Sequence, residues 1–255
     1  MIVDTHTHLY LKDFEADIDL VIQRSIDLNI KKFFLPAIDS THTKSMLSLK
    51  NRYPNLMHLM AGLHPCSVKD NYIDELNHVK DILDSEKITA IGEIGIDLYW
   101  DKSTLKTQKI AFKNQINLAK KYDLPIVIHC RDAFDEIFEI LELENHEKLR
   151  GIFHCFSGSY EQAIKAISFN MKLGIGGVAT FKNGRIDTFL NKIPLNNIVL
   201  ETDSPYLAPA PYRGKRNESS YLSIIIKKLS EIYNISENNI SEITTNNAFE
   251  IFKKL

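Results

Sequence analysis

The sequence is poor in cysteine, nearly neutral in net charge and free of long apolar runs, and each of these absences excludes a class of protein. Its three cysteines, Cys66, Cys130 and Cys155, are odd in number and show no Cys-x-x-Cys spacing. We therefore expect no disulfide framework and no cysteine-built zinc site, and we predict a reducing, cytoplasmic location. Cys130 and Cys155 are interpreted as small buried hydrophobic residues. The formal net charge of −2 gives no whole-molecule attraction to nucleic acid, so a site for a polyanion must be local.

The chain also lacks a membrane-spanning segment, because no stretch approaches the roughly 18 consecutive apolar residues that a span requires. The opening Met-Ile-Val-Asp has neither the basic nor the apolar character of a leader peptide. We expect a soluble, unprocessed protein with no membrane partner, and the sequence indicates no obligatory protein partner.

Apolar residues recur in a pattern that alternates short strands with helices. Eight aliphatic or β-branched runs begin near residues 2, 32, 57, 88, 125, 151, 171 and 197. Between them lie helical patterns such as 14–26 and 105–119, in which apolar side chains follow the spacing of one helix face. Such strands, with nearly continuous apolar cores, are typical of a parallel sheet buried on both faces. The sequence therefore predicts an α/β fold: a single-domain TIM-like (β/α)8 barrel over residues 1–255, with extra C-terminal helices near 222–232 and 236–252.

An open, doubly wound sheet is the alternative arrangement of the same elements. Such sheets commonly carry a glycine-rich, phosphate-binding turn after the first strand, and here His6-Thr7-His8 occupies that place. We therefore prefer the barrel.

Histidines and carboxylates follow most of the predicted strands. They are His6, His8, His64, Glu93, His129, His154 and Asp203. Side chains alternate between the two faces of a strand, so His6 and His8 should project to the same side while Thr7 turns away. In a parallel barrel the carboxyl ends of all strands meet at one mouth, so these scattered residues are expected to converge.

The number of these side chains favours two metal ions over one. A catalytic zinc ion commonly takes three protein ligands, and four histidines with two carboxylates exceed that number. Two divalent ions that share a carboxylate fit the set better, and such a pair suits phosphodiester hydrolysis. Mixed imidazole and carboxylate ligands are compatible with Mg²⁺, Mn²⁺ or Zn²⁺, so the residue types do not select the metal.

The motifs around these residues resemble those of a known family. They are Asp4-Thr-His-Thr-His-Leu9, Gly92-Glu-Ile-Gly-Ile-Asp97, His129-Cys-Arg-Asp-Ala133, His154-Cys-Phe-Ser-Gly158, Glu201-Thr-Asp-Ser-Pro-Tyr-Leu-Ala-Pro209 and Arg213-Gly-Lys-Arg-Asn-Glu218. Their order and spacing are similar to those of the TatD family of metal-dependent deoxyribonucleases, within the amidohydrolase superfamily, over nearly the whole chain. The resemblance implies a TIM-barrel hydrolase that uses divalent metal and has DNA as its substrate, often as a 3′-to-5′ exonuclease.

The resemblance also implies a role for each residue. One metal ion would be bound by His6, His8 and Asp203, the second by His129 and His154, with Glu93 as the bridge and His64 near the scissile phosphate. Asp203 could also accept a proton from the attacking water, the role of a general base. The chain departs from the family pattern at Cys66, Cys130 and Ser219, which removes no proposed ligand but leaves the substrate preference open.

Other charged residues near these motifs have less specific interpretations. Asp4 and Glu201 share the parity of the neighbouring ligands but lie deeper, so we expect them to support ligands rather than bind metal. The run Arg213-Gly-Lys-Arg216, with Lys182 and Arg185, is compatible with a basic rim for a phosphate backbone and equally with a solvated loop. Arg213 is the substrate-binding candidate in this run.

Two other functions use the same residues. A C–N or ester hydrolase, of the amidohydrolase or lactonase type, could share the scaffold, since barrels support many reactions. Many such amidohydrolases resemble one another in carrying a metal-bridging carboxylated lysine on the fourth strand, where this chain has Glu93, and this favours the nuclease. A non-catalytic metal-binding scaffold is disfavoured because the chain retains Asp203, the candidate base.

Overall fold

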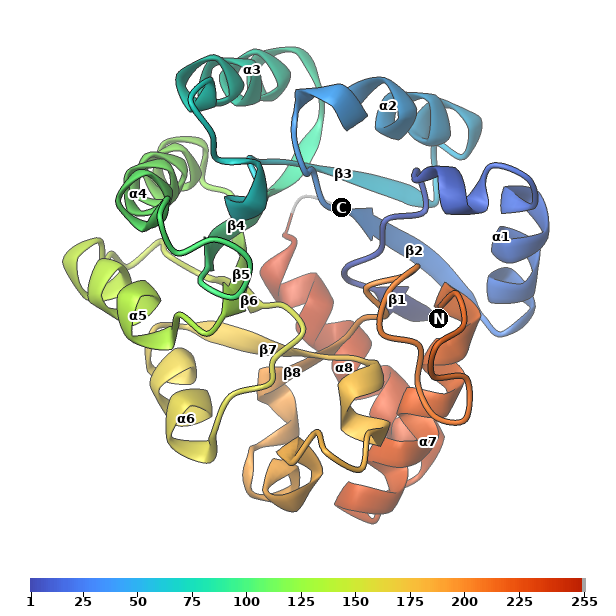
Figure 1. Cartoon of the computed structure of the whole chain (residues 1–255). Coiled ribbons are helices and arrows are strands. Elements are labelled where there is room, and N and C mark those ends of the chain that lie inside the picture. Colours follow the sequence, from blue (N-terminus) through green and yellow to red (C-terminus); the bar gives the residue numbers. More distant parts are fainter. Residues whose placement is uncertain (254–255) are drawn as a thin grey trace.

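Eight parallel strands follow one another around a barrel in the order of the sequence, as the computed structural model shows for residues 1–253 (Figure 1). The strands are β1 (Ile2–Asp4), β2 (Ile30–Leu35), β3 (Met57–Ala61), β4 (Ile88–Asp97), β5 (Ile126–Arg131), β6 (Gly151–Phe153), β7 (Met171–Ile175) and β8 (Ile198–Leu200). The predicted TIM-like (β/α)8 barrel is confirmed. Residues 254–255 of the predicted 1–255 domain lie outside the described residues.

The barrel closes where β8 meets the segment that follows β1. The Thr5 amide donates to the Leu200 carbonyl oxygen at 3.0 Å, and Thr7 forms a parallel bridge with Ser204. The hydroxyl oxygens of Thr7 and Ser204 also lie 2.6 Å apart. These contacts hold the chain on both sides of His6 against the end of β8, so two motifs from opposite ends of the sequence become neighbours.

Helices surround the barrel and close one of its ends (Figure 1). They are α1 (Ile18–Asp27), α2 (Thr43–Arg52), α3 (Tyr72–Ser85), α4 (Leu105–Tyr122), α5 (Phe134–Leu143), α6 (Tyr160–Ser168), α7 (Leu222–Tyr233) and α8 (Glu237–Ile251). Ser159 opens α6 with a capping box, in which it and Gln162 each accept a hydrogen bond from the other's backbone amide. In the part of the chain that the structure describes, no helix has the length and apolar character needed to cross a membrane.

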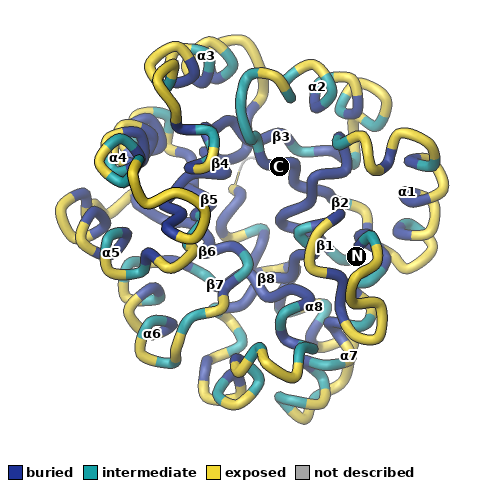
Figure 2. Tube along the Cα trace, viewed as in Figure 1, coloured by how far each residue is buried: buried dark blue, intermediate teal, exposed yellow. Residues whose placement is uncertain are grey.

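Buried side chains form two cores. Figure 2 shows that buried residues are concentrated in the strands and on the inward faces of the helices. The larger core fills the space between strands and helices. The smaller core takes one residue from each of seven strands and ends against α8, where Phe252 stacks on Phe34 with ring centroids 3.9 Å apart. The Asn247 side chain in α8 also donates to the Ile198 carbonyl oxygen at the start of β8. Helix α8 thus closes the amino-terminal end of the barrel, and the opposite end stays available for a site.

Several strands differ in extent from the sequence prediction, and the differences at β1, β4 and β5 affect the site. β5 continues to Arg131, so His129 lies inside the strand. β1 ends at Asp4, so His6 and His8 lie beyond the regular strand, in a segment held by the contacts to β8. β4 continues to Asp97, so Glu93 lies inside the strand rather than after its end.

Gly95 allows β4 to continue past Glu93. Its φ is 145°, and a Cβ at this position would lie 2.0 Å from the carbonyl oxygen of His129 on β5. Only glycine adopts such a conformation beside a neighbouring backbone without steric cost. This close approach aligns Glu93 and Asp97 with His129.

Candidate metal centre

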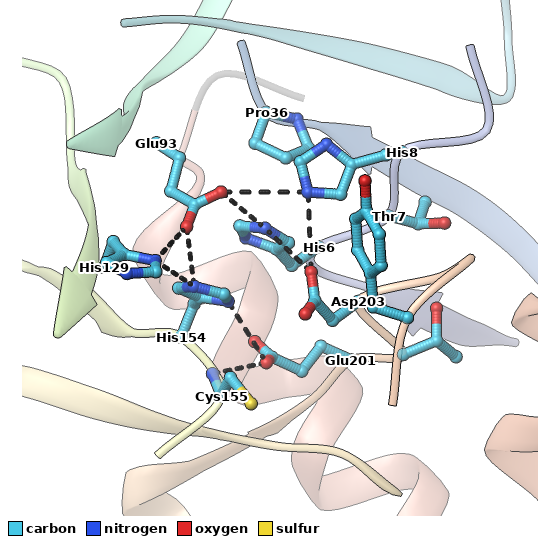
Figure 3. A network of polar contacts seen from close by, with 12 residues as sticks. His6, Thr7, His8, Pro36, Glu93, His129, His154, Cys155, Glu201 and Asp203 are labelled. Carbon is cyan, nitrogen blue, oxygen red and sulfur yellow. Dashed lines mark hydrogen bonds and ion pairs between the residues drawn. The ribbon is translucent and has the colours of Figure 1, made fainter. Parts of the chain in front are cut away.

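Glu93 lies among five histidines at the carboxyl end of the barrel, and its two oxygens face different ones. Figure 3 shows four of them, His6, His8, His129 and His154. Glu93 Oε2 is 3.2 Å from His6 Nε2 and 3.7 Å from His8 Nε2. Glu93 Oε1 faces a second group, at 2.7 Å from His129 Nδ1, 2.8 Å from His154 Nε2 and 3.2 Å from His64 Nε2. One carboxylate therefore joins two groups of imidazole nitrogens.

Asp203 completes the first group. Its Oδ1 lies 3.4 Å from His8 Nε2 and 3.6 Å from His6 Nε2. Its amide donates to the His6 carbonyl oxygen at 2.9 Å, and its φ of 57° lies in the left-handed region, which aspartate adopts more readily than most residues. The turn and the backbone bond hold this carboxylate beside the two histidines.

Tyr10 fixes the orientation and the tautomer of His8. The Tyr10 hydroxyl donates to the Pro36 carbonyl oxygen at 2.6 Å, so its oxygen is free to accept a hydrogen bond from His8 Nδ1, which lies 2.8 Å away. The proton of the neutral His8 ring is therefore on Nδ1. His8 Nε2, the nitrogen nearest Glu93 and Asp203, keeps its lone pair for a metal ion.

Asp97 fixes the orientation and the tautomer of His129. Its Oδ2 lies 2.8 Å from His129 Nε2, and its Oδ1 accepts hydrogen bonds from the amides of Tyr99 and Trp100. Burial opposes ionisation of Asp97, but the hydrogen bond from His129 and these two amides lower its pKa to about 2. An ionised carboxylate only accepts hydrogen bonds, so the proton of His129 is on Nε2 and its Nδ1 lone pair faces Glu93.

Glu201 lies beside His154 and the chain that follows it. Glu201 Oε1 accepts a hydrogen bond from the Cys155 amide and lies 3.6 Å from His154 Nδ1. A Cβ at Gly174 would lie 2.1 Å from Glu201 Oε2, so glycine is required there to admit the carboxylate. The chain turns at Cys155, with a φ of 46°. Cys155 and Cys130 are both half-buried, whereas the sequence predicted that both are buried. The regular alternation on which that prediction rests ends before Cys155.

His64 differs from His8 and His129 because it presents a proton and not a lone pair to the centre. Its Nδ1 accepts a hydrogen bond from the Cys66 amide at 3.0 Å. The proton of the neutral ring is therefore on Nε2, which lies 3.2 Å from Glu93 Oε1. His64 is thus placed to donate a hydrogen bond at the edge of the centre.

The charges of the centre depend on one another. Burial opposes ionisation of Glu93, but the surrounding imidazoles, His154 first, hold its pKa well below the usual range. Burial likewise opposes protonation of His154, yet Glu93 and Glu201 raise its pKa well above the usual value. For Asp203, the neighbouring histidines, His8 first, outweigh burial and lower the pKa. Buried carboxylates of this kind are stable when positive charge lies beside them.

The residues fit divalent metal ions. Among the described residues, both ring nitrogens of His6 and Nδ1 of His154 are buried without a hydrogen-bond partner. Three sets have ligand atoms within 4.8 Å of one another: His6, His8 and Asp203; His6, Glu93 and His154; and His64, Glu93 and His129. A buried imidazole without a partner is costly, and coordination of a metal ion removes that cost.

The structure does not bring the predicted basic rim into this cluster. Arg213 lies in the exposed loop after β8, with its guanidinium stacked 3.7 Å above the Phe181 ring. Arg216 forms a two-point ion pair with Asp17, at 2.7 Å for both contacts. Asp17 therefore matches the charge of Arg216. Substrate binding by Arg213 stays a prediction.

Sequence reasoning missed Tyr10 and Asp97, which orient His8 and His129. A signal exists for Asp97, because it shares the parity of Glu93 on the same strand and ends the motif Gly92-Glu-Ile-Gly-Ile-Asp97. Tyr10 follows His8 by two positions, but its role depends on Pro36, which is distant in the sequence. That contact exists only in the folded chain.

Comparison with known proteins identifies the family. The family model named TatD related DNase matches residues 3–253. The chain belongs to the TatD family. The metal-dependent hydrolase YabD of Bacillus subtilis is 37% identical to this TatD-family chain over 99% of both sequences. The crystal structure of YjjV, a TatD homologue from Escherichia coli, has a TM-score of 0.93 at 28% identity and covers 100% of this chain and 98% of its own.

The family predicted from the motifs is thus confirmed, and the protein is a metal-dependent hydrolase on a TIM barrel. A more distant similarity concerns the fold alone. The lactonase Lmo2620 of Listeria monocytogenes has a TM-score of 0.66 at 12% identity, covering 98% of this chain and 94% of its own. At that identity the similarity extends to the barrel and not to the substrate.

Proposed function

We propose that this TatD-family protein hydrolyses phosphodiester bonds in DNA, releasing nucleotides from the 3′ end. The proposal rests on the division of the imidazole nitrogens between the two oxygens of Glu93. A carboxylate shared in this way suits two divalent ions, and a two-ion centre suits in-line displacement at phosphorus. The family, whose model is named for a DNase, supports the same substrate.

Each group of residues would hold one ion. His6, His8 and Asp203 would bind the first, His129 and His154 the second, and Glu93 both. When bound, divalent ions such as Mg²⁺, Mn²⁺ or Zn²⁺ supply Lewis acidity, which lowers the pKa of water and offsets charge on phosphoryl oxygens. Tyr10 and Asp97 keep the lone pairs of His8 and His129 directed at the centre.

The chain's own residues would also move protons and orient the substrate. Asp203 is ionised at neutral pH because the imidazoles hold its pKa down, so its carboxylate can accept a proton from the attacking water. The water oxygen then bonds to phosphorus as the ester bond to the leaving nucleotide oxygen breaks. Because the His64 proton is on Nε2, His64 would donate a hydrogen bond to a phosphate oxygen.

The proposal is tested with metal-depleted protein reconstituted separately with Mg²⁺, Mn²⁺ and Zn²⁺. Each form is offered single- and double-stranded DNA labelled at the 5′ or the 3′ end, beside a panel of cyclic amides and lactones. We expect DNA cleavage with at least one metal and early release of the 3′ label. Glu93→Gln and Asp203→Asn should each lower the rate by about 100-fold or more, whereas Glu231→Gln, an exposed change on α7, should not.

Two results would contradict the proposal. One is the absence of DNA cleavage with any of the three metals when a cyclic amide or lactone is hydrolysed. The other is DNA cleavage that persists at the wild-type rate in both Glu93→Gln and Asp203→Asn. Early release of the 5′ label would correct the direction of digestion alone.

A further inference from the structure

The loop between β4 and α4 carries two large aromatic side chains that lie in solvent. Trp100, the only tryptophan of the chain, is 71% exposed, and Tyr99 is 55% exposed. Their rings meet edge to face, with centroids 5.0 Å apart. Figure 2 shows this loop exposed, directly after the buried β4. Aromatic rings that the fold leaves in water, and that no described core residue covers, are available to a ligand.

This aromatic pair is held in place rather than loose. The Asp97 carboxylate accepts hydrogen bonds from the amides of both Tyr99 and Trp100, at 2.9 and 3.0 Å. The backbone of Asp97 is fixed in turn by the Gln108 side chain, which accepts from its amide and donates to its carbonyl oxygen. The Arg131 guanidinium stacks 3.7 Å above the Tyr99 ring. We call Tyr99, Trp100 and Arg131 the aromatic platform.

The aromatic platform is joined to the metal centre through one residue. Asp97 binds the loop through Oδ1 and His129 through Oδ2. Arg131 ends the strand that carries His129, two positions away. The part of a substrate that lies on the platform would therefore be next to the part that reacts at the metal centre.

The charges beside the aromatic platform indicate which part of a nucleic acid would bind there. A hollow next to Tyr99 and Arg131 is also lined by Asp132, Asp135 and Glu136. One positive and three negative side chains give this hollow a net negative charge, which disfavours a phosphate group. A nucleobase is neutral, and its flat face stacks on aromatic rings and on guanidinium groups.

We propose that the aromatic platform binds the base of a single-stranded nucleotide next to the phosphodiester that is cleaved. This inference rests on the proposed DNA substrate and deepens it, because it names the residues that bind a base, and an unpaired base has a face free to stack on them. Paired bases are stacked within the duplex and do not offer a free face. The platform residues bind and position the substrate and do not react.

Trp100 makes the binding directly measurable. The metal-loaded protein is titrated with a hexadeoxynucleotide whose linkages are phosphorothioates, and the tryptophan fluorescence is followed. A matched oligomer with the same linkages and abasic sugars carries equal charge without bases. We expect quenching by the oligomer with bases, and binding on the order of 10- to 100-fold weaker for the abasic one. Equal affinity and equal quenching for both oligomers would overturn the proposal.

Variants separate stacking from a structural role. Tyr99→Ala and Trp100→Ala should raise the KM for single-stranded DNA by about 10-fold or more, and should affect bis(4-nitrophenyl) phosphate, which has no nucleobase, much less. Trp100→Phe, which keeps an aromatic face, should restore most of the affinity. Leu143→Ala is the matched control, since Leu143 is 72% exposed on α5. An unchanged KM for DNA in both alanine variants would overturn the proposal.

The fluorescence titration keeps the two proposals distinct. Base-dependent quenching without cleavage of DNA by any metal form would support the aromatic platform and contradict the proposed nuclease. Cleavage of DNA without base-dependent quenching would support the nuclease and contradict the platform.

Discussion

Replacement of Asp97 by asparagine tests whether metal affinity depends on a residue that does not itself bind metal. The wild-type carboxylate accepts from His129 Nε2 through one oxygen and from the amides of Tyr99 and Trp100 through the other. An asparagine side chain has one accepting oxygen and one NH2 group that only donates, so it cannot accept from both His129 and the two amides. If its amide group faces His129, the imidazole proton must move to Nδ1, the nitrogen that faces Glu93.

The opposite orientation of the asparagine leaves two backbone amides facing a donor. Either orientation removes a favourable hydrogen bond from a buried site. Loss of such an orienting partner typically weakens metal binding by about 10- to 100-fold, which corresponds to about 1.4 to 2.7 kcal/mol.

The assay is calorimetric titration of metal-depleted protein with Mn²⁺, together with thermal unfolding to verify the fold. Asp101→Asn is the matched control, because the Asp101 carboxylate accepts hydrogen bonds from Ser103, within its own loop, and lies at the surface. We expect weaker binding of Mn²⁺ in Asp97→Asn and wild-type binding in Asp101→Asn. A folded Asp97→Asn protein that binds Mn²⁺ within twofold of the wild type would show that metal affinity does not depend on the contact between Asp97 and His129.

Three further predictions concern other parts of the fold. Gly174→Ala places a Cβ 2.1 Å from Glu201 Oε2 and should lower the free energy of unfolding by about 1 to 3 kcal/mol in urea titrations; wild-type stability would contradict the steric argument. Tyr10→Phe removes the acceptor of His8 Nδ1 and should weaken Mn²⁺ binding by about 10-fold in the same calorimetric assay, so unchanged affinity would show that the tautomer needs no such support. Burial and nearby lysines lower the pKa of His58 from 6.5 to about 3. The contribution of the neutral His58 ring to the free energy of unfolding is therefore fully present above pH 6.5 and is lost as the pH falls toward 3. Allowing for solvent screening, the loss between about pH 7 and about pH 5 is about 1 kcal/mol. His58→Phe should remove this pH dependence in urea unfolding, and an unchanged slope would contradict it.

The periodicity of the sequence predicted the barrel because parallel strands buried on both faces leave a strong local signal. Strand ends were predicted less well. β4 continues past Glu93 because it pairs with β5, where Gly95 packs against His129, and local propensity does not encode that pairing. His6 and His8 converge although β1 has already ended, because contacts to β8 hold the segment.

The sequence predicted those residues of the candidate site that come at the ends of predicted strands. His64 was included, but its distinct character depends on which ring nitrogen carries the proton, and the Cys66 amide decides this in the folded chain. Arg216 illustrates the opposite case, because a charge that looks free in the sequence is matched by Asp17, 199 residues away. Charge and proton positions are set by tertiary contacts, so residue types alone do not reveal them.

We propose that the Glu93 carboxylate joins two metal ions. Electron paramagnetic resonance of metal-depleted protein titrated with Mn²⁺ tests it directly, since two ions that share a carboxylate are magnetically coupled. We predict two Mn²⁺ ions per chain with an exchange-coupled spectrum, and loss of the coupling in Glu93→Gln. A wild-type protein that binds one Mn²⁺ ion, or two ions with the spectrum of isolated Mn²⁺, would contradict the claim.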